Sequence, residues 1–158
     1  MKMMQTPVLA MVVLAMVMSG TITSKQLDAF GTTNKQDVKY LAGVMTEENG
    51  NNSDVCQLLT GSVVLNRMKS DKWNGSTIEE VIMATDGGFL QYARKTRNNF
   101  KIVKSTKRTK LLAKYLLIFG PICPENVVYQ GMTKAGTGEY WKEKTPDGYE
   151  YFCYEWNE

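Results

Sequence analysis

The chain has no histidine among its 158 residues, and this absence excludes several kinds of catalysis. A Ser-His-Asp triad or a Cys-His pair cannot be built without an imidazole base. The common catalytic zinc sites also depend on histidine ligands. These facts argue against a zinc amidase or a papain-like peptidase acting on wall peptides, and carboxylates become the best candidates for acid–base chemistry.

Cysteine is scarce as well. Cys56, Cys123 and Cys153 are the three cysteines, and no Cys-x-x-Cys pair occurs, which excludes a zinc ribbon or a thioredoxin motif. Two interpretations fit them equally. They form one disulfide and leave one free thiol, or they are small buried apolar side chains. No pattern indicates a metal or an organic cofactor, and we expect none.

One apolar run stands out, at residues 8–18, and it has 11 residues. A helix needs about 20 apolar residues to cross a bilayer, so we expect no stable membrane span. Lys2 precedes the run, and the small residues Ser19-Gly20-Thr21 follow it, which is typical of a secretory signal. We therefore predict a signal peptide at 1–24, an exported protein located in the cell wall or outside the cell, and a fold without this segment.

The rest of the chain has the composition of a globular domain. Apolar residues make up 43% and charged residues 22% of the sequence, which is near the usual balance. Residues 25–36 are polar and predict a flexible lead-in. Residues 37–158 are long enough for one domain with one hydrophobic core.

Helical spacing of apolar residues dominates the first part of this domain, and short strand patterns dominate the end. Four helices are predicted, at 37–48, 54–70, 78–84 and 106–119. The pair Gly61-Ser62 keeps one face of the second helix small enough for another element to approach. A strand at 126–130 and a hairpin of 139–141 and 149–156, turning at Thr145-Pro146-Asp147-Gly148, follow. Helices first and strands last indicate an α+β domain with a small antiparallel sheet near the C-terminus.

Charge is segregated along the chain. Residues 94–114 hold nine basic side chains and no acidic one, whereas residues 139–158 hold six acidic side chains and two lysines. The basic run is a solvated helix face or a surface that attracts anionic wall polymers. We expect no nucleic-acid partner, because the net charge is only +3 and no nucleic-acid motif occurs.

Two carboxylates, Glu47 and Glu48, lie at the predicted end of the helix 37–48, just before the polar break at 49–52. A carboxyl group that protonates a glycosidic oxygen must keep its proton near the working pH. Raising a glutamate pKa from about 4.3 to about 6 corresponds to roughly 2.3 kcal/mol. The helix end supplies only ~0.3–1 kcal/mol of this, so we expect an apolar or aromatic wall, such as Tyr92 or Tyr129, beside Glu48.

The segment 41–67, LAGVMTEENGNNSDVCQLLTGSVVLNR, resembles the catalytic domain of the SleB-type cell wall hydrolases, the spore cortex-lytic family. In that family a glutamate follows a short apolar helix, and a Val-Val-Leu-Asn-Arg block follows at a fixed distance. Here Glu48 lies 18 residues before Asn66, so no gap is needed. The segment 77–82 and the pair Gln91-Tyr92 extend the resemblance, which covers about 37–158 and is weak after residue 93.

The resemblance implies a compact lysozyme-like or lytic-transglycosylase-like domain that acts on peptidoglycan, and we expect it to act as a monomer. The implied reaction cleaves the β-1,4 bond between N-acetylmuramic acid and N-acetylglucosamine and leaves a 1,6-anhydromuramic end. Glu48 is the implied catalytic residue, with Glu47 as the fallback. Gln91, Tyr92 and Tyr129 are the candidates for sugar binding, and each of them has a purely structural alternative.

Two other functions stay open at this point. A hydrolytic muramidase needs a second carboxylate near the first, and Asp54 and Asp86 are the candidates by their place in the chain. Gly43, Thr46 and Glu47 depart from the family's usual residues. These departures fit a secreted wall-binding protein that keeps the fold without activity.

Overall fold

The computed structural model describes residues 6–73, 75–86, 89–92 and 101–156. Helices come first along these residues: α1 (Pro7–Met18), α2 (Ser24–Leu27), α3 (Lys35–Asn49), α4 (Asp54–Lys69), α5 (Ile78–Ile82) and α6 (Lys107–Phe119). Between α5 and α6, β1 (Thr85–Asp86) pairs with β2 (Phe89–Leu90). The last strands are β3 (Val127–Gly131), β4 (Gly138–Thr145) and β5 (Gly148–Tyr154). The predicted α+β class, with helices first and a small antiparallel sheet at the C-terminal end, is confirmed.

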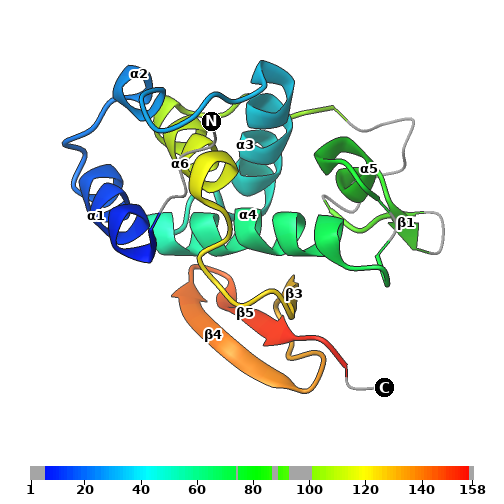
Figure 1. Cartoon of the computed structure of the whole chain (residues 1–158). Helices are drawn as coiled ribbons and strands as arrows, with labels where there is room; N and C mark the ends of the chain where they lie inside the picture. The colour runs from blue at the N-terminus through cyan, green and yellow to red at the C-terminus, as the bar shows by residue number, and fades with distance from the viewer. Residues whose placement is uncertain (1–5, 74, 87–88, 93–100, 157–158) are drawn as a thin grey trace.

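Helix α4 crosses the middle of the molecule, with the other helices on one side and the three-stranded sheet on the other (Figure 1). Gly61 allows this packing. A Cβ atom at this position would collide with Leu116 of α6 and would crowd Met45 of α3. The small face predicted at Gly61-Ser62 is therefore the place where α3 and α6 meet α4.

Side-chain caps set where the helices begin. Asn34, Ser53 and Thr106 each accept a backbone hydrogen bond at the start of α3, α4 and α6, as residues at this position usually do. Thr77 and Glu80 form a capping box at the start of α5. That helix ends at Ile82, two residues before the predicted end.

The hairpin of β4 and β5 turns at the predicted residues. Thr145 pairs with Gly148, which leaves Pro146 and Asp147 as the two-residue loop, and Gly148 has φ of +134°. Strand β5 lies between β3 and β4, and all pairs are antiparallel. Its fully buried Phe152 packs with apolar residues of α4 and β3, which attaches the sheet to the central helix.

The three cysteines are free and buried, which matches the second of the two interpretations of their role. Burial raises the pKa of the Cys56 thiol to about 12 and that of Cys123 to about 11. Both thiols are therefore protonated and poorly reactive in the folded chain.

The N-terminal segment belongs to the helical layer of this structure. Val13 and Val17 of α1 are fully buried, the Tyr115 hydroxyl of α6 donates to the carbonyl of Ala10 (3.1 Å), and Arg108 donates to the carbonyl of Val17. The predicted lead-in contains α2, whose Leu27 is also buried. Whether this segment acts as a signal peptide stays a prediction, but the fold of the full chain includes it.

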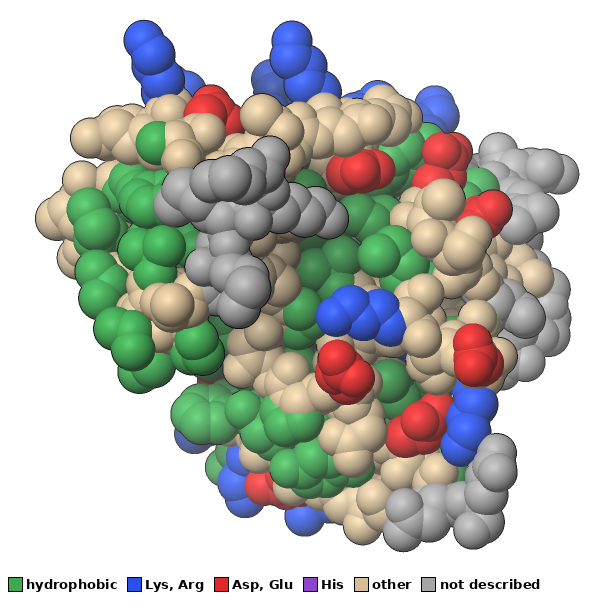
Figure 2. Space-filling model, viewed as in Figure 1, with side chains coloured by type: hydrophobic (Ala, Val, Ile, Leu, Met, Phe, Trp, Pro, Cys, Tyr) green, Lys and Arg blue, Asp and Glu red, His purple; other side chains and the backbone are tan. Residues whose placement is uncertain are grey.

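The outer side of α1 is apolar and exposed. Figure 2 shows these apolar side chains at the left edge of the molecule, and Val8, Met11 and Val12 are among them. None of the helices in the described part of the chain has the length and apolar character needed to cross a membrane.

Candidate active site

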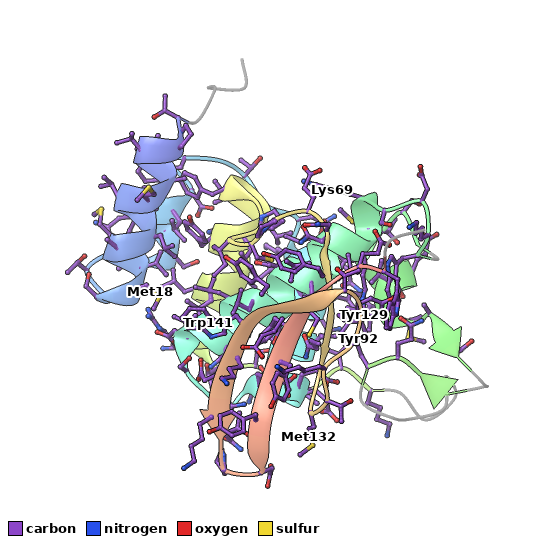
Figure 3. All side chains as sticks on the ribbon, turned by 90° about the horizontal axis from the view of Figure 1, so that it is seen from below. Met18, Lys69, Tyr92, Tyr129, Met132 and Trp141 are labelled. Carbon is purple, nitrogen blue, oxygen red and sulfur yellow. The ribbon has the colours of Figure 1, made fainter. Side chains whose placement is uncertain are left out.

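A cavity of about 580 Å³ lies between the end of α3 and the tip of the β4–β5 hairpin. The residues that line it come from five places: the end of α3 with the loop after it, α4, the segment after β2, the end of β3, and the hairpin. They are Thr46–Asn52, Arg67, Gln91, Tyr92, Gln130–Met132, Thr145–Asp147 and Glu150. Segments far apart in the sequence thus form its wall. In Figure 3, Met132 lies beside the tip of the hairpin.

The end of α3 places both predicted carboxylates, Glu47 and Glu48, in the wall of this cavity. Asn49 fixes this helix end because its side chain is buried, donates to Thr60 Oγ1 (2.7 Å) and accepts from Asn52 Nδ2 (2.5 Å). The helix ends at Asn49, one residue after the predicted end, and Gly50 is its C-cap. Gly50 keeps a right-handed φ of −63°, and its N–H still bonds to the carbonyl of Thr46.

Arg67 connects α4 to the other walls of the cavity. Its buried guanidinium donates to the Val128 carbonyl (2.7 Å) and to Gln91 Oε1 (3.2 Å). It also lies 4.1 Å from the ring centre of Trp73 and 5.1 Å from that of Tyr92, so cation–π attraction adds to these bonds. This arrangement fixes the position of the predicted sugar-binding pair Gln91-Tyr92.

The neighbouring Asn66 has a structural role. Its side-chain amide donates to the carbonyls of Pro124 (2.8 Å) and Val127 (3.0 Å), which holds the chain entering β3 against α4. The resembling Asn-Arg block therefore supports the cavity, and only Arg67 reaches its wall.

The hydroxyl group of Tyr92 is buried. The residue is 2% exposed, and among the described residues its hydroxyl has no hydrogen-bond partner of normal geometry. Burial raises the pKa of this hydroxyl, the Arg67 charge opposes the rise, and the Glu48 charge adds to it. Glu48 and Tyr92 line the same cavity, and the aromatic wall expected beside Glu48 stays a prediction.

Tyr129 and Asp54, two residues singled out from the sequence, lie elsewhere. The ring of Tyr129 packs edge-on against Trp73 at 5.5 Å between centres, and Tyr129 is not among the residues that line the cavity. Asp54 forms an ion pair with Arg108 at the start of α4, away from the cavity. The side chain of Asp86 lies outside the described part of the structure.

A further carboxylate in the cavity, Glu150, was not predicted. It lies on β5, is half-buried, and lines the wall formed by the hairpin. Its pKa is raised chiefly by burial and further by the charge of Glu48, while a hydrogen bond from Asn49 lowers it. Side chains alternate along a strand, so its spacing from the buried Phe152 was the available signal that Glu150 faces inward.

Comparisons of the chain with protein-family models, with curated proteins and with solved structures find no match. The lysozyme-like relationship therefore stays a prediction. Among the residues that the structure describes, no group of three or more acidic or cysteine side chains is placed to hold a metal ion.

Proposed function

We propose that this chain cleaves the glycan strand of peptidoglycan, between N-acetylmuramic acid and N-acetylglucosamine, with Glu48 as the general acid. The observation that carries the proposal is the position of Glu48, a carboxylate at the end of α3 in the wall of a cavity. A concave site with convergent polar groups and a perturbed titratable group is the usual setting of an active site. The substrate is outside the cytoplasm, which agrees with the predicted export.

Glu48 gives its proton to the glycosidic oxygen as the bond from that oxygen to the sugar C1 breaks. Buried Tyr92 and half-buried Glu150 line the same cavity as Glu48. Arg67 lines it as well, and its guanidinium is bonded to Val128 and Gln91.

The cavity suits a sugar in size and in chemistry. Its volume of about 580 Å³ falls within the range of roughly 300–1,000 Å³ that is common for small-molecule sites. Its wall holds carboxylates, side-chain amides and the guanidinium of Arg67. Sugar hydroxyls both donate and accept hydrogen bonds, so such a wall can pair with a glycan.

In the reaction that the resemblance implies, the substrate's own C6 hydroxyl attacks C1 and leaves a 1,6-anhydromuramic end. Hydrolysis by water is a second candidate, and the presence of Glu150 in the same cavity favours it. Two carboxylates are the usual equipment of hydrolytic glycosidases. The products of the two reactions differ by one molecule of water.

Digestion of purified peptidoglycan by the full chain, followed by mass spectrometry of the soluble fragments, tests the proposal. We expect fragments that end in muramic acid, either as the anhydro form or as the reducing form that is one water heavier. Fragments cut only in the peptide stems would contradict glycan cleavage. Binding without any soluble fragment would instead support the wall-binding alternative.

A further inference from the structure

We propose that Glu150 is a second catalytic carboxylate, which accepts the proton of the hydroxyl that attacks the sugar. This inference rests on the proposed function, in which Glu48 is the acid. It adds a residue from the last strand of the chain to a reaction that the resemblance assigns to a single glutamate.

Glu150 and Glu48 reach the same cavity from two elements that are distant in sequence. Glu48 comes from the end of α3, and Glu150 comes from β5, next to the hairpin turn. Asn49, the residue after Glu48, lines the same cavity as Glu150 and is itself anchored to Thr60.

The wall that contains these carboxylates is polar. Asn51, Asn52, Gln91 and Gln130 are among its residues, and so is Arg67. Side-chain amides both donate and accept hydrogen bonds, and a guanidinium donates them. The two carboxylates therefore share a wall with residue types that can pair with a polar ligand.

The proton balance of the step needs one acid and one acceptor. Glu48 gives its proton to the glycosidic oxygen, which leaves with the electron pair of the broken C1–O bond. The attacking oxygen forms the new bond to C1, and its proton passes to the ionised Glu150. The same balance holds when the attacking hydroxyl is water, which yields a reducing end, and when it is the substrate's C6 hydroxyl, which yields the anhydro end.

The charged groups around Glu150 are mostly acidic. Among the described residues, the charged or titratable groups that face it or lie in the same wall are Glu47, Glu48, Cys56, Arg67, Tyr92, Glu143 and Asp147. The pKa of Glu150 is raised chiefly by burial and further by the Glu48 charge. A nearby negative charge makes a carboxyl group harder to ionise.

The test compares Glu150→Gln with a matched control, Glu139→Gln, in the full chain. Glu139 lies on the same hairpin, outside the cavity lining, in an ion pair with Lys134. The rate of fragment release from peptidoglycan is measured across pH for both variants and for the wild type. We expect Glu150→Gln to lose about 100-fold to 10,000-fold in rate, as removal of a general base does, while the control keeps the wild-type rate.

The shape of the pH profile separates a catalytic role from a structural one. The wild type should lose activity at low pH, where Glu150 is protonated, and at high pH, where the acid is ionised. In Glu150→Gln the low-pH loss should disappear, and the high-pH loss should move to lower pH because a nearby negative charge is gone. Mass spectrometry of the wild-type fragments identifies whether water or the C6 hydroxyl attacks.

Several outcomes would overturn the inference. One is a Glu150→Gln rate equal to that of the control, and another is a reduced rate with an unchanged pH profile. A third is a Glu150→Gln variant that unfolds more easily than the wild type at neutral pH. The raised pKa of Glu150 predicts instead that this variant is at least as stable as the wild type. Failure of the proposed function would give different results. The wild type would then cleave no glycan, or Glu48→Gln would keep full activity.

Discussion

Shortening Val17 to alanine tests whether α1 is part of the folded core. Val17 is fully buried against the helical layer, and Val12, on the same helix, is 52% exposed. The substitution removes the equivalent of two buried methylene groups, at about 0.8 kcal/mol each, or about 1.6 kcal/mol. Incomplete collapse of the cavity raises the expected loss to about 2–3 kcal/mol.

Urea unfolding of the full chain, followed by circular dichroism, measures this loss as a lower midpoint at an unchanged slope. The control is Val12→Ala, which makes the same chemical change on the exposed side of α1 and should cost less than about 0.5 kcal/mol. Equal free energies of unfolding for the two variants would refute the packing of α1 on α6. That result would leave residues 7–18 as a detached segment, as a signal peptide would be.

Three further predictions concern the support of the cavity and its titration. Asn66→Asp replaces a donor to two carbonyls with an acceptor. The free energy of unfolding should therefore fall by about 3 kcal/mol or more, as urea titrations measure. An unchanged free energy of unfolding would contradict the role of Asn66. The buried thiols, including Cys56 with its pKa of about 12, should react slowly with a thiol reagent at pH 8 and fully after denaturation, and rapid labelling of folded protein would contradict their burial. The raised pKa of Glu150 means that ionisation destabilises the fold above the unfolded pKa and that this cost disappears as pH falls. Glu150→Gln should therefore be at least as stable as the wild type at pH 7, with a smaller difference at pH 4, as thermal unfolding can measure.

Local signals in the sequence were sufficient for the elements of the fold. The apolar spacing around Leu58 and Leu65 predicts α4, and the small pair Gly61-Ser62 predicts the close contact that α3 and α6 make with it. The turn at Pro146-Asp147 likewise predicts the hairpin. Each of these features depends on neighbours within one or two turns of the chain, so a single sequence contains them.

The composition of the site was only partly predictable. The position of Glu48 could be predicted, because a helix end followed by a polar break is a local feature of the sequence. The structure places this residue in the cavity wall. Glu150 enters the same wall through the docking of the sheet on α4, which depends on the burial of Phe152 and on strand pairing far along the chain. Tyr129 was predicted as a sugar-binding residue, but its ring packs against Trp73 and it does not line the cavity.

The N-terminal segment shows a different limit of sequence reasoning. Its apolar run and small residues fit a secretory signal, yet the same apolar character lets Val13 and Val17 pack into the core. A run that is hydrophobic on all sides is compatible with a signal peptide and with a packed helix. Such a run has no polar face, so its periodicity does not indicate which face is covered. The burial of Val13 and Val17 and the contacts from Tyr115 and Arg108 of α6 show a packed helix in the full chain.

The most direct test of the central claim is the initial rate of glycan cleavage by Glu48→Gln, measured beside Glu47→Gln as fragments released from purified peptidoglycan. Both variants change one adjacent carboxylate at the end of α3 to its neutral isostere. The account predicts a rate lower by about 100-fold or more for Glu48→Gln, as loss of a general acid gives, and a rate near that of the wild type for Glu47→Gln. An active Glu48→Gln beside an inactive Glu47→Gln, or equal activity in both, would contradict the assignment of Glu48 as the acid.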